Sequence, residues 1–234
     1  MNIINLRIIQ GSEQDYPPAD INIVIDVIRA FTVSHLAFIR GVREIFLVNT
    51  VDEAFSLRAK NPAYLLAGEI AGLPIADFDL DNSPHTFSSA DVENKSLVQK
   101  TSNGVKATLH ALNADIILVT GLSNAKQTAL YARLQTANKL NATINIIASH
   151  AGDDDDLACA DYIRDILLDS NQIELAEIQA RITNSRPAQK FFDATQTKFD
   201  FRDMNYCTKE ITSDFVMVVD KSLPIPRIIK KQFV

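Results

Sequence analysis

Short apolar runs alternate along this chain with segments in which apolar residues recur every three or four positions. The runs have the length of β-strands, and near-continuous ones such as Ile-Ile-Leu-Val at 116–119 are typical of strands buried on both faces. They predict strands at Ile21–Asp26, Glu44–Val48, Tyr64–Ala67, Ser96–Lys100, Asp115–Thr120 and Thr143–Ser149. The periodic segments predict helices at Ala30–Arg40, Val51–Lys60, Gly104–Asn113, Asn124–Lys139 and Asp154–Asp169. This alternation predicts an α/β fold, a three-layer α/β/α arrangement with a largely parallel or mixed central sheet.

The pattern is less regular after Leu168. We expect a helix at Gln172–Ala180 and strands at Met204–Thr208 and Phe215–Val219, which extend the sheet or cap it. Because no linker rich in Pro, Gly or Ser interrupts the chain, we expect residues 1–234 to form a single domain.

Composition narrows the class of protein. With 47% hydrophobic and 22% charged residues, the 234-residue chain has the composition of a globular protein. The net charge of -6 argues against nucleic-acid binding, as do basic residues that are scattered until Arg227, Lys230 and Lys231. No apolar run approaches the length that crosses a membrane, and no signal-peptide pattern opens the chain. With only two cysteines, we therefore expect a cytoplasmic protein with reduced thiols.

Signatures of several other chemistries are missing. The sequence has neither the G-x-x-x-x-G-K-[ST] phosphate loop nor a G-x-G-x-x-G after a strand, which disfavours nucleotide binding. A zinc site is disfavoured because the histidines lack a paired-ligand spacing, and each is expected on the surface or on a helix: His35, His85, His110 and His150. Cys159 lies at helical spacing from Asp156, which favours a buried, unreactive thiol.

Polar residues gather where the predicted strands end. Asp26 ends the first long strand and is followed by Arg29, and Glu69 follows the third strand. The next three strands are each followed by a short polar segment, which we call the strand exit, namely Thr101-Ser102-Asn103-Gly104, Gly121-Leu122-Ser123-Asn124 and His150-Ala151-Gly152 followed by Asp153 to Asp156. Ligands of open α/β sheets bind at the carboxyl ends of the strands, so five exits on one edge of the sheet predict a shared site. Taken singly, each of these residues is better explained as a helix cap, above all Asp26, Ser123 and Asp154.

The longest stretch without strand or helix periodicity runs from residue 67 to residue 84. It carries four carboxylates whose oxygens suit a hard cation such as Mg²⁺, namely Glu69, Asp77, Asp79 and Asp81. Asp77-Phe78-Asp79 matches the Asp-x-Asp of aspartyl-phosphate phosphatases, but it does not directly follow a buried strand, so we interpret the match as coincidence. Ser83-Pro84 is typical of a helix N-cap followed by proline at the first helical position.

Several of these segments together resemble the 2-phosphosulfolactate phosphatase family. Asp26-Val27-Ile28-Arg29-Ala30-Phe31-Thr32 is similar to its Asp-Val-x-Arg-Ala-Thr-Thr segment. Gly68-Glu69 and Phe78-Asp79-Leu80-Asp81-Asn82-Ser83-Pro84 are similar to its Gly-Glu-Arg and Phe-Asp-Leu-Gly-Asn-Ser-Pro. Thr101-Ser102-Asn103-Gly104-Val105 is similar to its Thr-Thr-Asn-Gly-Thr, and Asp155-Asp156-Leu157-Ala158-Cys159-Ala160 to its Glu-Asp-x-x-x-Ala-Gly. The order and spacing match over roughly residues 20–165, and the motifs are specific when taken jointly.

The chain also departs from the family pattern. Ile70 stands where the family has an arginine, Ser102 and Val105 replace threonines, and Asp81 and Asp161 replace glycines. Isoleucine cannot form the bidentate anion contact of an arginine. If that arginine binds phosphate or sulfonate, its loss affects substrate specificity or activity.

The resemblance and the acidic strand exits together imply magnesium-dependent hydrolysis of a phosphomonoester of a small organic acid. The family substrate is 2-phosphosulfolactate, which gives sulfolactate and phosphate in coenzyme M biosynthesis. On this hypothesis the metal ligands are Asp26, Glu69 and Asp156, with Asp79 and Asp155 as second choices. Arg29 binds the phosphate or a second anionic group of the substrate. The residues expected to bind or orient the substrate are Asn82, Ser83, Thr101, Asn103, Gly104 and Asn124.

Two alternatives stay open. A degenerate family member would bind a phosphorylated or sulfonated metabolite without turning it over, as Ile70, Asp81 and Val105 suggest. A phosphatase for a different small phosphoester is the other, because family constrains reaction type more tightly than substrate. A homodimer is the default expectation for the assembly.

Overall fold

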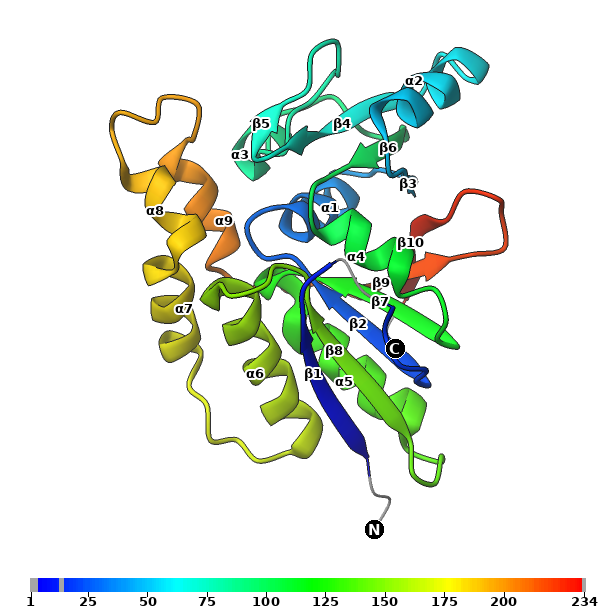
Figure 1. Ribbon diagram of the computed structural model, residues 1–234, viewed down its shortest axis with the longest axis vertical. Helices are drawn as coiled ribbons and strands as arrows, with labels where there is room; N and C mark the ends of the chain where they lie inside the picture. The colour runs from blue at the N-terminus through cyan, green and yellow to red at the C-terminus, as the bar shows by residue number, and fades with distance from the viewer. Residues whose placement is uncertain (1–3, 13–14, 233–234) are drawn as a thin grey trace.

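The computed structural model describes residues 4–12 and 15–232. Within them, one sheet has the strand order β1-β8-β2-β7-β9-β10-β3-β6-β4-β5 (Figure 1). The strands are β1 (Asn5–Gln10), β2 (Ile21–Ile25), β3 (Glu44–Leu47), β4 (Leu65–Ile70), β5 (Leu73–Pro74), β6 (Ser96–Lys100), β7 (Ile116–Thr120), β8 (Thr143–Ala148), β9 (Phe215–Asp220) and β10 (Arg227–Gln232).

Helices fill most of the connections. They are α1 (Ala30–Ile39), α2 (Val51–Lys60), α3 (Pro84–Phe87), α4 (Gly104–His110), α5 (Ala125–Thr136), α6 (Asp154–Leu168), α7 (Leu175–Asn184), α8 (Arg186–Phe192) and α9 (Met204–Cys207), with short 3₁₀ turns at η1 (Leu122–Asn124) and η2 (Phe201–Asp203). None of the described helices is both long and apolar enough to cross a membrane.

Two groups of parallel strands make up most of the sheet. Strands β1, β8, β2 and β7 pair in parallel and form a first half-sheet. Strands β3, β6 and β4 also pair in parallel and form a second half-sheet. The β9–β10 hairpin joins the two through three successive antiparallel pairings, β7 with β9, β9 with β10 and β10 with β3. Because each pairing reverses the direction, the two half-sheets run in opposite directions.

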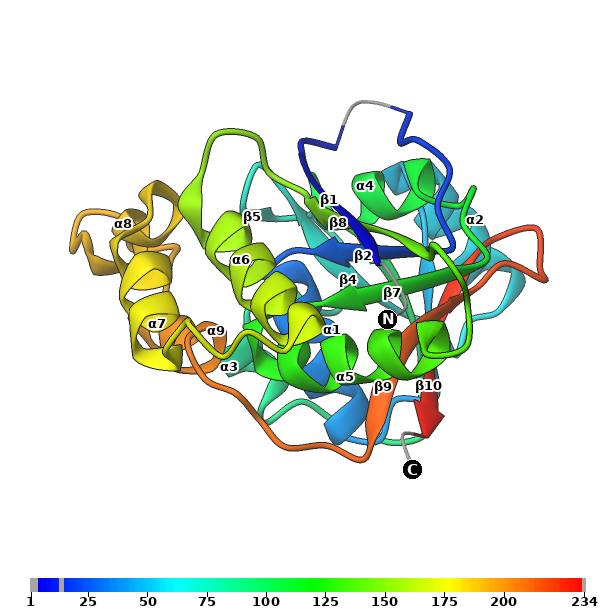
Figure 2. The ribbon, with the colours of Figure 1, turned by 90° about the horizontal axis from the view of Figure 1, so that it is seen from below.

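The sheet bends around α1 and α4, which lie between the two half-sheets (Figure 1). Val24 of β2, Ile45 of β3 and Ala37 of α1 are all fully buried in the same apolar cluster. Helices α5 and α6 cover the opposite face of the first half-sheet and share a second apolar cluster with it (Figure 2). Helix α2 covers the outer face of the second half-sheet. Both faces of the strands are thus buried, which explains their near-continuous apolar runs.

The predicted fold class is confirmed, since the structure is an α/β fold with a mixed sheet between helices. The six strands and five helices predicted between residues 21 and 169 are all present, with ends within three residues of the prediction. Ser83 accepts a hydrogen bond from Thr86 N and caps α3, as its sequence indicated.

The prediction was wrong at Met204–Thr208, which forms helix α9 and not a strand. Met204 and Cys207 are both buried, three residues apart, as on one face of a helix. In so short a segment, helical and strand periodicity cannot be told apart. Strands β1 and β10 and helix α8 were not predicted.

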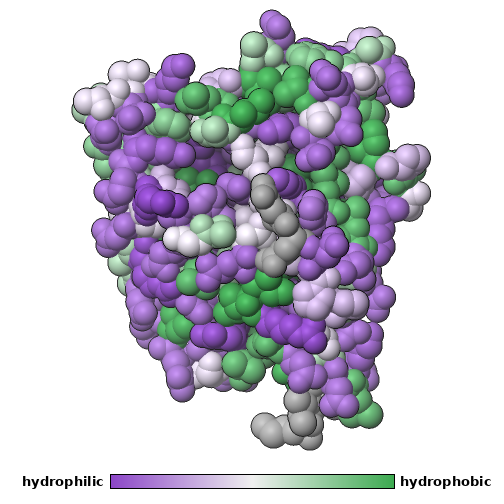
Figure 3. All heavy atoms as spheres, in the orientation of Figure 1, coloured by the Kyte–Doolittle hydropathy of each residue, from purple (hydrophilic) through white to green (hydrophobic). Residues whose placement is uncertain are grey.

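Most of the surface in the view of Figure 3 is polar, with apolar residues gathered near the top, over β4 and β5. Ile70 and Leu73 are exposed there. Along β4, Glu69 is buried whereas the next residue, Ile70, is 47% exposed. Because successive side chains of a strand point to opposite faces, Glu69 is directed inward and Ile70 outward.

Candidate functional site

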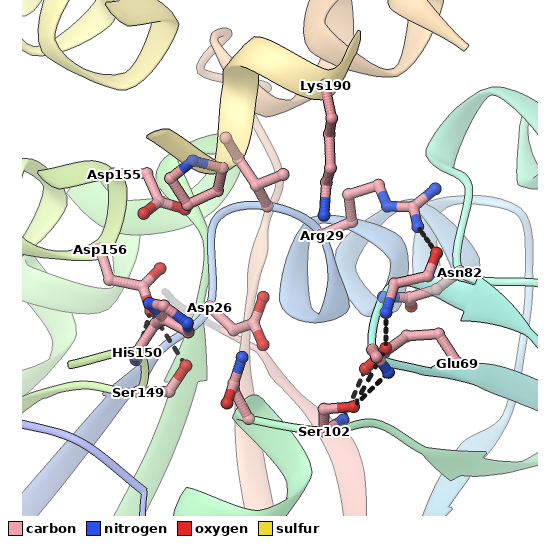
Figure 4. A pocket seen from close by; sticks show the side chains of 15 residues that line it. Asp26, Arg29, Glu69, Asn82, Ser102, Ser149, His150, Asp155, Asp156 and Lys190 are labelled. Atoms are coloured by element: carbon pink, nitrogen blue, oxygen red, sulfur yellow. Dashed lines mark hydrogen bonds between the residues drawn. The ribbon is translucent and has the colours of Figure 1, made fainter. Parts of the chain in front are cut away.

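A cavity of about 230 Å³ lies where the carboxyl ends of β2, β4, β6 and β8 converge (Figure 4). These strands belong to both half-sheets, which run in opposite directions, so the expectation of a single common sheet edge was wrong. The bend of the sheet around α1 and α4 brings the strand ends together instead. The wall is formed by Asp26, Ile28, Arg29, Glu69, Ala71, Gly72, Asn82, Ser102, Asn103, Ser149, His150, Asp155, Asp156, Pro187 and Lys190.

Asp26 joins two helix N-termini beneath the cavity. Its Oδ1 accepts a hydrogen bond of 2.9 Å from Ala30 N, the first residue of α1. Its Oδ2 accepts one of 2.8 Å from Gly104 N, the first residue of α4. The side chain therefore acts as a cap, as the simpler interpretation held, and it also lines the cavity.

Two neighbouring aspartates enter the cavity from the first turn of α6. Asp156 is occupied by backbone and hydroxyl donors, with Val27 N at 2.8 Å from Oδ1 and Ser149 Oγ at 2.9 Å from Oδ2. Asp155 Oδ1, in contrast, is buried without a hydrogen-bond partner among the described residues. A buried carboxylate oxygen without a donor is costly, and it marks a place where a ligand would be stabilised.

Glu69 fastens two loops of the second half-sheet to each other. Its carboxylate accepts hydrogen bonds from Ser102 N at 2.5 Å, from Ser102 Oγ at 3.1 Å and from Gly72 N. Ser102 Oγ lies 2.9 Å from Ala71 N as well. These contacts hold the β4–β5 turn against the loop that precedes α4.

Two cations face the carboxylates (Figure 4). Arg29 is only 6% exposed, and its Nη1 donates to Asp203 at 2.9 Å while its Nη2 donates to Gly72 O at 2.9 Å. Asp203 also accepts from Ser83 Oγ at 2.5 Å and from His85 N at 3.1 Å. Lys190 reaches the cavity from α8.

Burial dominates the electrostatics of the carboxylates. It raises the pKa of Asp26 to about 6, to which the charge of Glu69 contributes. It raises the pKa of Asp155 to about 7 and that of Asp156 well above the ordinary range, and in both cases the neighbouring aspartates add repulsion. Carboxylates that repel one another out of water favour a proton or a cation between them.

The donor set fits a hard cation in part. Among the residues that the structure describes, no three carboxylate, imidazole or thiolate groups converge closely enough to hold one ion. Asp26, Glu69 and Asp156, the predicted metal ligands, therefore do not by themselves form a three-carboxylate metal site. Mg²⁺, however, often takes only one or two carboxylates together with waters and substrate phosphate. The unpartnered Asp155 Oδ1 near the repelling carboxylate of Asp26 fits that smaller set.

The structure brings six of the residues predicted for the site into the cavity wall, namely Asp26, Arg29, Glu69, Asn82, Asn103 and Asp156. Ser83, Thr101 and Gly104 lie outside the wall, and each bonds to a loop or helix that carries it. Asn124 is not brought to the cavity, because its side chain bonds within the β7–α5 connection, to Thr120, Gly121 and Thr128. Asp79, a second choice for the metal, instead pairs with Arg58 at 2.6 Å. The other second choice, Asp155, lines the cavity.

Sequence reasoning missed several residues of the site. Ser149 lines the cavity and was not among the predicted site residues. His150 also lines it and stands in one of the polar segments predicted at the strand ends, but no role in the site was predicted for it. Lys190, Pro187 and the buried partner Asp203 lie beyond residue 168, where strand and helix periodicity is weak. The signals available were the helix start Ser185-Arg186-Pro187 and the cationic Lys190 five residues after Ser185, a pattern too common to identify a site.

Ionisation of the cavity carboxylates should weaken the folded state. The pKa values of Asp155 and Asp156 are higher in the folded than in the unfolded chain, so the folded state binds more protons and stability falls as pH rises through these values. Buried His35, whose pKa is lowered to about 4, has the opposite effect, but only below about pH 6.5. Without divalent cations, we expect the free energy of unfolding to be at least about 1 kcal/mol lower at pH 8.5 than at pH 6.5.

Urea unfolding at the two pH values measures this difference, and Asp155→Asn is its control because the variant should show a smaller loss. A wild-type protein that is equally stable at both pH values, or more stable at pH 8.5, would contradict the assignment of raised pKa values.

Comparison with known proteins agrees with the motifs. A family model described as 2-phosphosulpholactate phosphatase matches residues 8–222. A protein of Bacillus subtilis (strain 168), named as a probable 2-phosphosulfolactate phosphatase, is 52% identical over 223 residues, which are 95% of this chain and 97% of that protein. A protein of Carboxydothermus hydrogenoformans with the same name is 29% identical over 80% of this chain and 81% of its own length. Another of that name, from Clostridium kluyveri, is 35% identical over 67% of this chain and 65% of its own length.

Proposed function

The chain belongs to the 2-phosphosulfolactate phosphatase family, and on that basis we propose that it hydrolyses 2-phosphosulfolactate to sulfolactate and phosphate with Mg²⁺ as cofactor. In this reaction the oxygen of a water molecule bonds to phosphorus, the ester P–O bond breaks, and a proton of the water reaches the leaving oxygen, which becomes the hydroxyl of sulfolactate. The observation that carries the proposal is the polarised cavity, in which buried carboxylates face Arg29 and Lys190.

Asp26 and Asp155 are the residues we propose to hold Mg²⁺, because Asp155 Oδ1 has no partner among the described residues and the two carboxylates repel each other. When bound, the ion neutralises charge on the phosphate oxygens and lowers the pKa of a water. Glu69 and Asp156, bonded to backbone N–H groups, keep the loops in place.

The remaining polar groups bind and orient the substrate. Arg29 has five N–H groups, and the structure engages its Nη1 and Nη2 through one hydrogen bond each, which leaves N–H groups for an anion. Asn82 lines the same cavity, and its buried Oδ1 lacks a hydrogen-bond partner among the described residues. The Asn82 amide can therefore hydrogen-bond a ligand and fix its orientation, as polar groups do in small-molecule sites.

The departures from the family motifs favour turnover over a degenerate binder. Ile70 is 47% exposed and is not part of the cavity wall. Val105 is buried in the apolar core, and Asp81 accepts a hydrogen bond from Ser83 N. None of these three residues is part of the cavity wall, so the substitutions do not take a polar group from it.

The test is phosphate release from racemic 2-phosphosulfolactate and a panel of phosphomonoesters, with Mg²⁺ and with chelator. Chelator-sensitive release from 2-phosphosulfolactate is the expected result. Release only from another ester would show that this ester, and not 2-phosphosulfolactate, is the substrate. Release that persists in chelator would show that the reaction does not depend on Mg²⁺. No release from any ester would favour the degenerate binder.

Gly104→Ala should lower this activity by disturbing Asp26. A Cβ on residue 104 would lie 2.6 Å from Asp26 Oδ2 and 2.8 Å from Asp26 Cβ, so the carboxylate must shift. We expect kcat/KM to fall by about 10-fold or more, because a displaced catalytic group loses alignment. The assay is initial-rate phosphate release, with circular dichroism to verify folding. Unchanged kcat/KM would show that the position of Asp26 is unimportant.

A further inference from the structure

Lys190 is a cavity cation that forms no ion pair within the described part of the chain. Its side chain descends from α8 and points into the cavity (Figure 4). Within the described part of the chain, Nζ makes no hydrogen bond or ion pair, and its contacts are with aromatic rings, at 4.6 Å from the centroid of Phe199 and 5.6 Å from that of Phe191. All three of its N–H donors are therefore available to a ligand.

Three arginines of this region, unlike Lys190, each form an ion pair. Arg29 is paired with Asp203 and lies 5.2 Å from the Phe191 centroid, so its guanidinium is fixed. Arg186 and Arg181 form ion pairs with aspartates of the α6 region. Burial, with the charge of Arg29, lowers the pKa of Lys190, and the carboxylates of Glu69, Asp155 and Asp26 act against this shift. A partly desolvated ammonium gains more from an anionic partner than an exposed one.

Helix α8 holds Lys190 over the cavity. Arg186 Nε and Nη2 donate to the two carboxylate oxygens of Asp153, both at 2.9 Å. Arg186 and Lys190 are four residues apart and so lie on the same face of α8. Pro187, one residue after Arg186, also lines the cavity. The bidentate pair thus fixes the face of α8 that presents Lys190.

We propose that Lys190 binds the non-phosphate acid group of the substrate, a carboxylate or a sulfonate, and thereby selects phosphomonoesters of organic acids over those of neutral alcohols. The inference rests on the proposed function, since it assumes that the phosphate lies by Asp26 and Asp155. Those carboxylates leave Arg29 and Lys190 as the cations for the rest of the ligand, and Lys190 has its donors free.

Lys190→Met tests the inference because methionine keeps the apolar stem of the side chain and removes the charge. The substrates are 2-phosphosulfolactate, 2-phospholactate, which lacks the sulfonate, and glycerol 2-phosphate, which lacks both acid groups. Loss of a hydrogen bond between charged groups should lower kcat/KM for 2-phosphosulfolactate about 10- to 100-fold, mostly through KM. For glycerol 2-phosphate we expect a change below about 3-fold.

Two further variants complete the design. Lys190→Arg should recover part of the loss, because it restores the charge. Lys198→Met, at an exposed position outside the cavity wall, removes the same charge and should leave every rate unchanged. An equal loss on 2-phosphosulfolactate and 2-phospholactate assigns Lys190 to the carboxylate, whereas a loss on the former alone assigns it to the sulfonate. An equal loss on all three esters would overturn the inference.

Calorimetric binding of sulfolactate separates the inference from the proposed function. If the wild-type protein hydrolyses no ester but binds sulfolactate, and Lys190→Met weakens that binding about 10-fold or more, the proposed function fails and the inference stands. If both proteins bind sulfolactate equally, or the wild type does not bind it, the inference fails whatever the turnover.

Discussion

Asp155→Asn should abolish most of the phosphate release, lowering kcat/KM by about 10³-fold, equivalent to about 4 kcal/mol of transition-state stabilisation. Asparagine has nearly the same size as aspartate but no charge, so it cannot attract a cation through the oxygen that stands unpartnered. The measurement is steady-state phosphate release from 2-phosphosulfolactate over a range of Mg²⁺ concentrations.

Asp154→Asn is the matched control for this variant. Asp154 is the preceding residue of α6, its side chain is 43% exposed and it pairs with Arg181 outside the cavity wall. We expect its kcat/KM to stay within about 3-fold of the wild type, because a substitution at a partly exposed site has a small effect. Full activity in Asp155→Asn, or equal losses in the two variants, would contradict the proposed role of Asp155.

Asp155→Asn, which should lower activity, should raise the stability of the folded protein. At pH 8 without divalent cations, Asp155→Asn removes one of the mutually repelling buried charges and should unfold at a higher urea concentration than the wild type. A variant that is inactive yet more stable indicates a site kept under strain for function. An inactive variant that is also less stable would instead indicate misfolding.

Asp203→Ala should have the largest effect on stability, lowering the free energy of unfolding by about 3–5 kcal/mol. Asp203 is fully buried and is the ion-pair partner of Arg29, which is itself 6% exposed. Removing the carboxylate leaves a buried guanidinium unpaired and takes an acceptor from Ser83 Oγ and His85 N. Urea unfolding measures the loss.

Asp200→Ala provides the comparison, since Asp200 pairs with Arg202 in the same short segment but on the surface, with side chains 32% and 53% exposed. Exposed pairs contribute little, so this variant should be destabilised far less than Asp203→Ala. Similar losses in the two variants would mean that burial of the Arg29–Asp203 pair does not determine its contribution.

The elements between residues 21 and 169 were predictable because their periodicity is local. In β7, apolar side chains on both faces give a continuous run, and in α6 buried residues such as Cys159, Ala160 and Ile163 recur at three- and four-residue spacing. The failures have equally local causes. The segment at 204–208 is too short to separate the two periods, and in β10 the adjacent charged residues Lys230 and Lys231 interrupt the apolar pattern of a strand.

The sequence by itself determined the α/β class, the family and the chemical character of the strand exits, because Asp26, Glu69 and Asp156 stand within short motifs at fixed spacing from their strands. Only the tertiary structure decided how those exits meet. Their strands belong to oppositely directed half-sheets, and the bend around α1 and α4 brings them to one cavity. It also decided that Asp155 has the unpartnered oxygen, whereas Asp156 is bonded to backbone, and that Lys190 and Asp203 join the site. These are contacts across more than a hundred residues, and no local periodicity encodes which distant side chains approach each other.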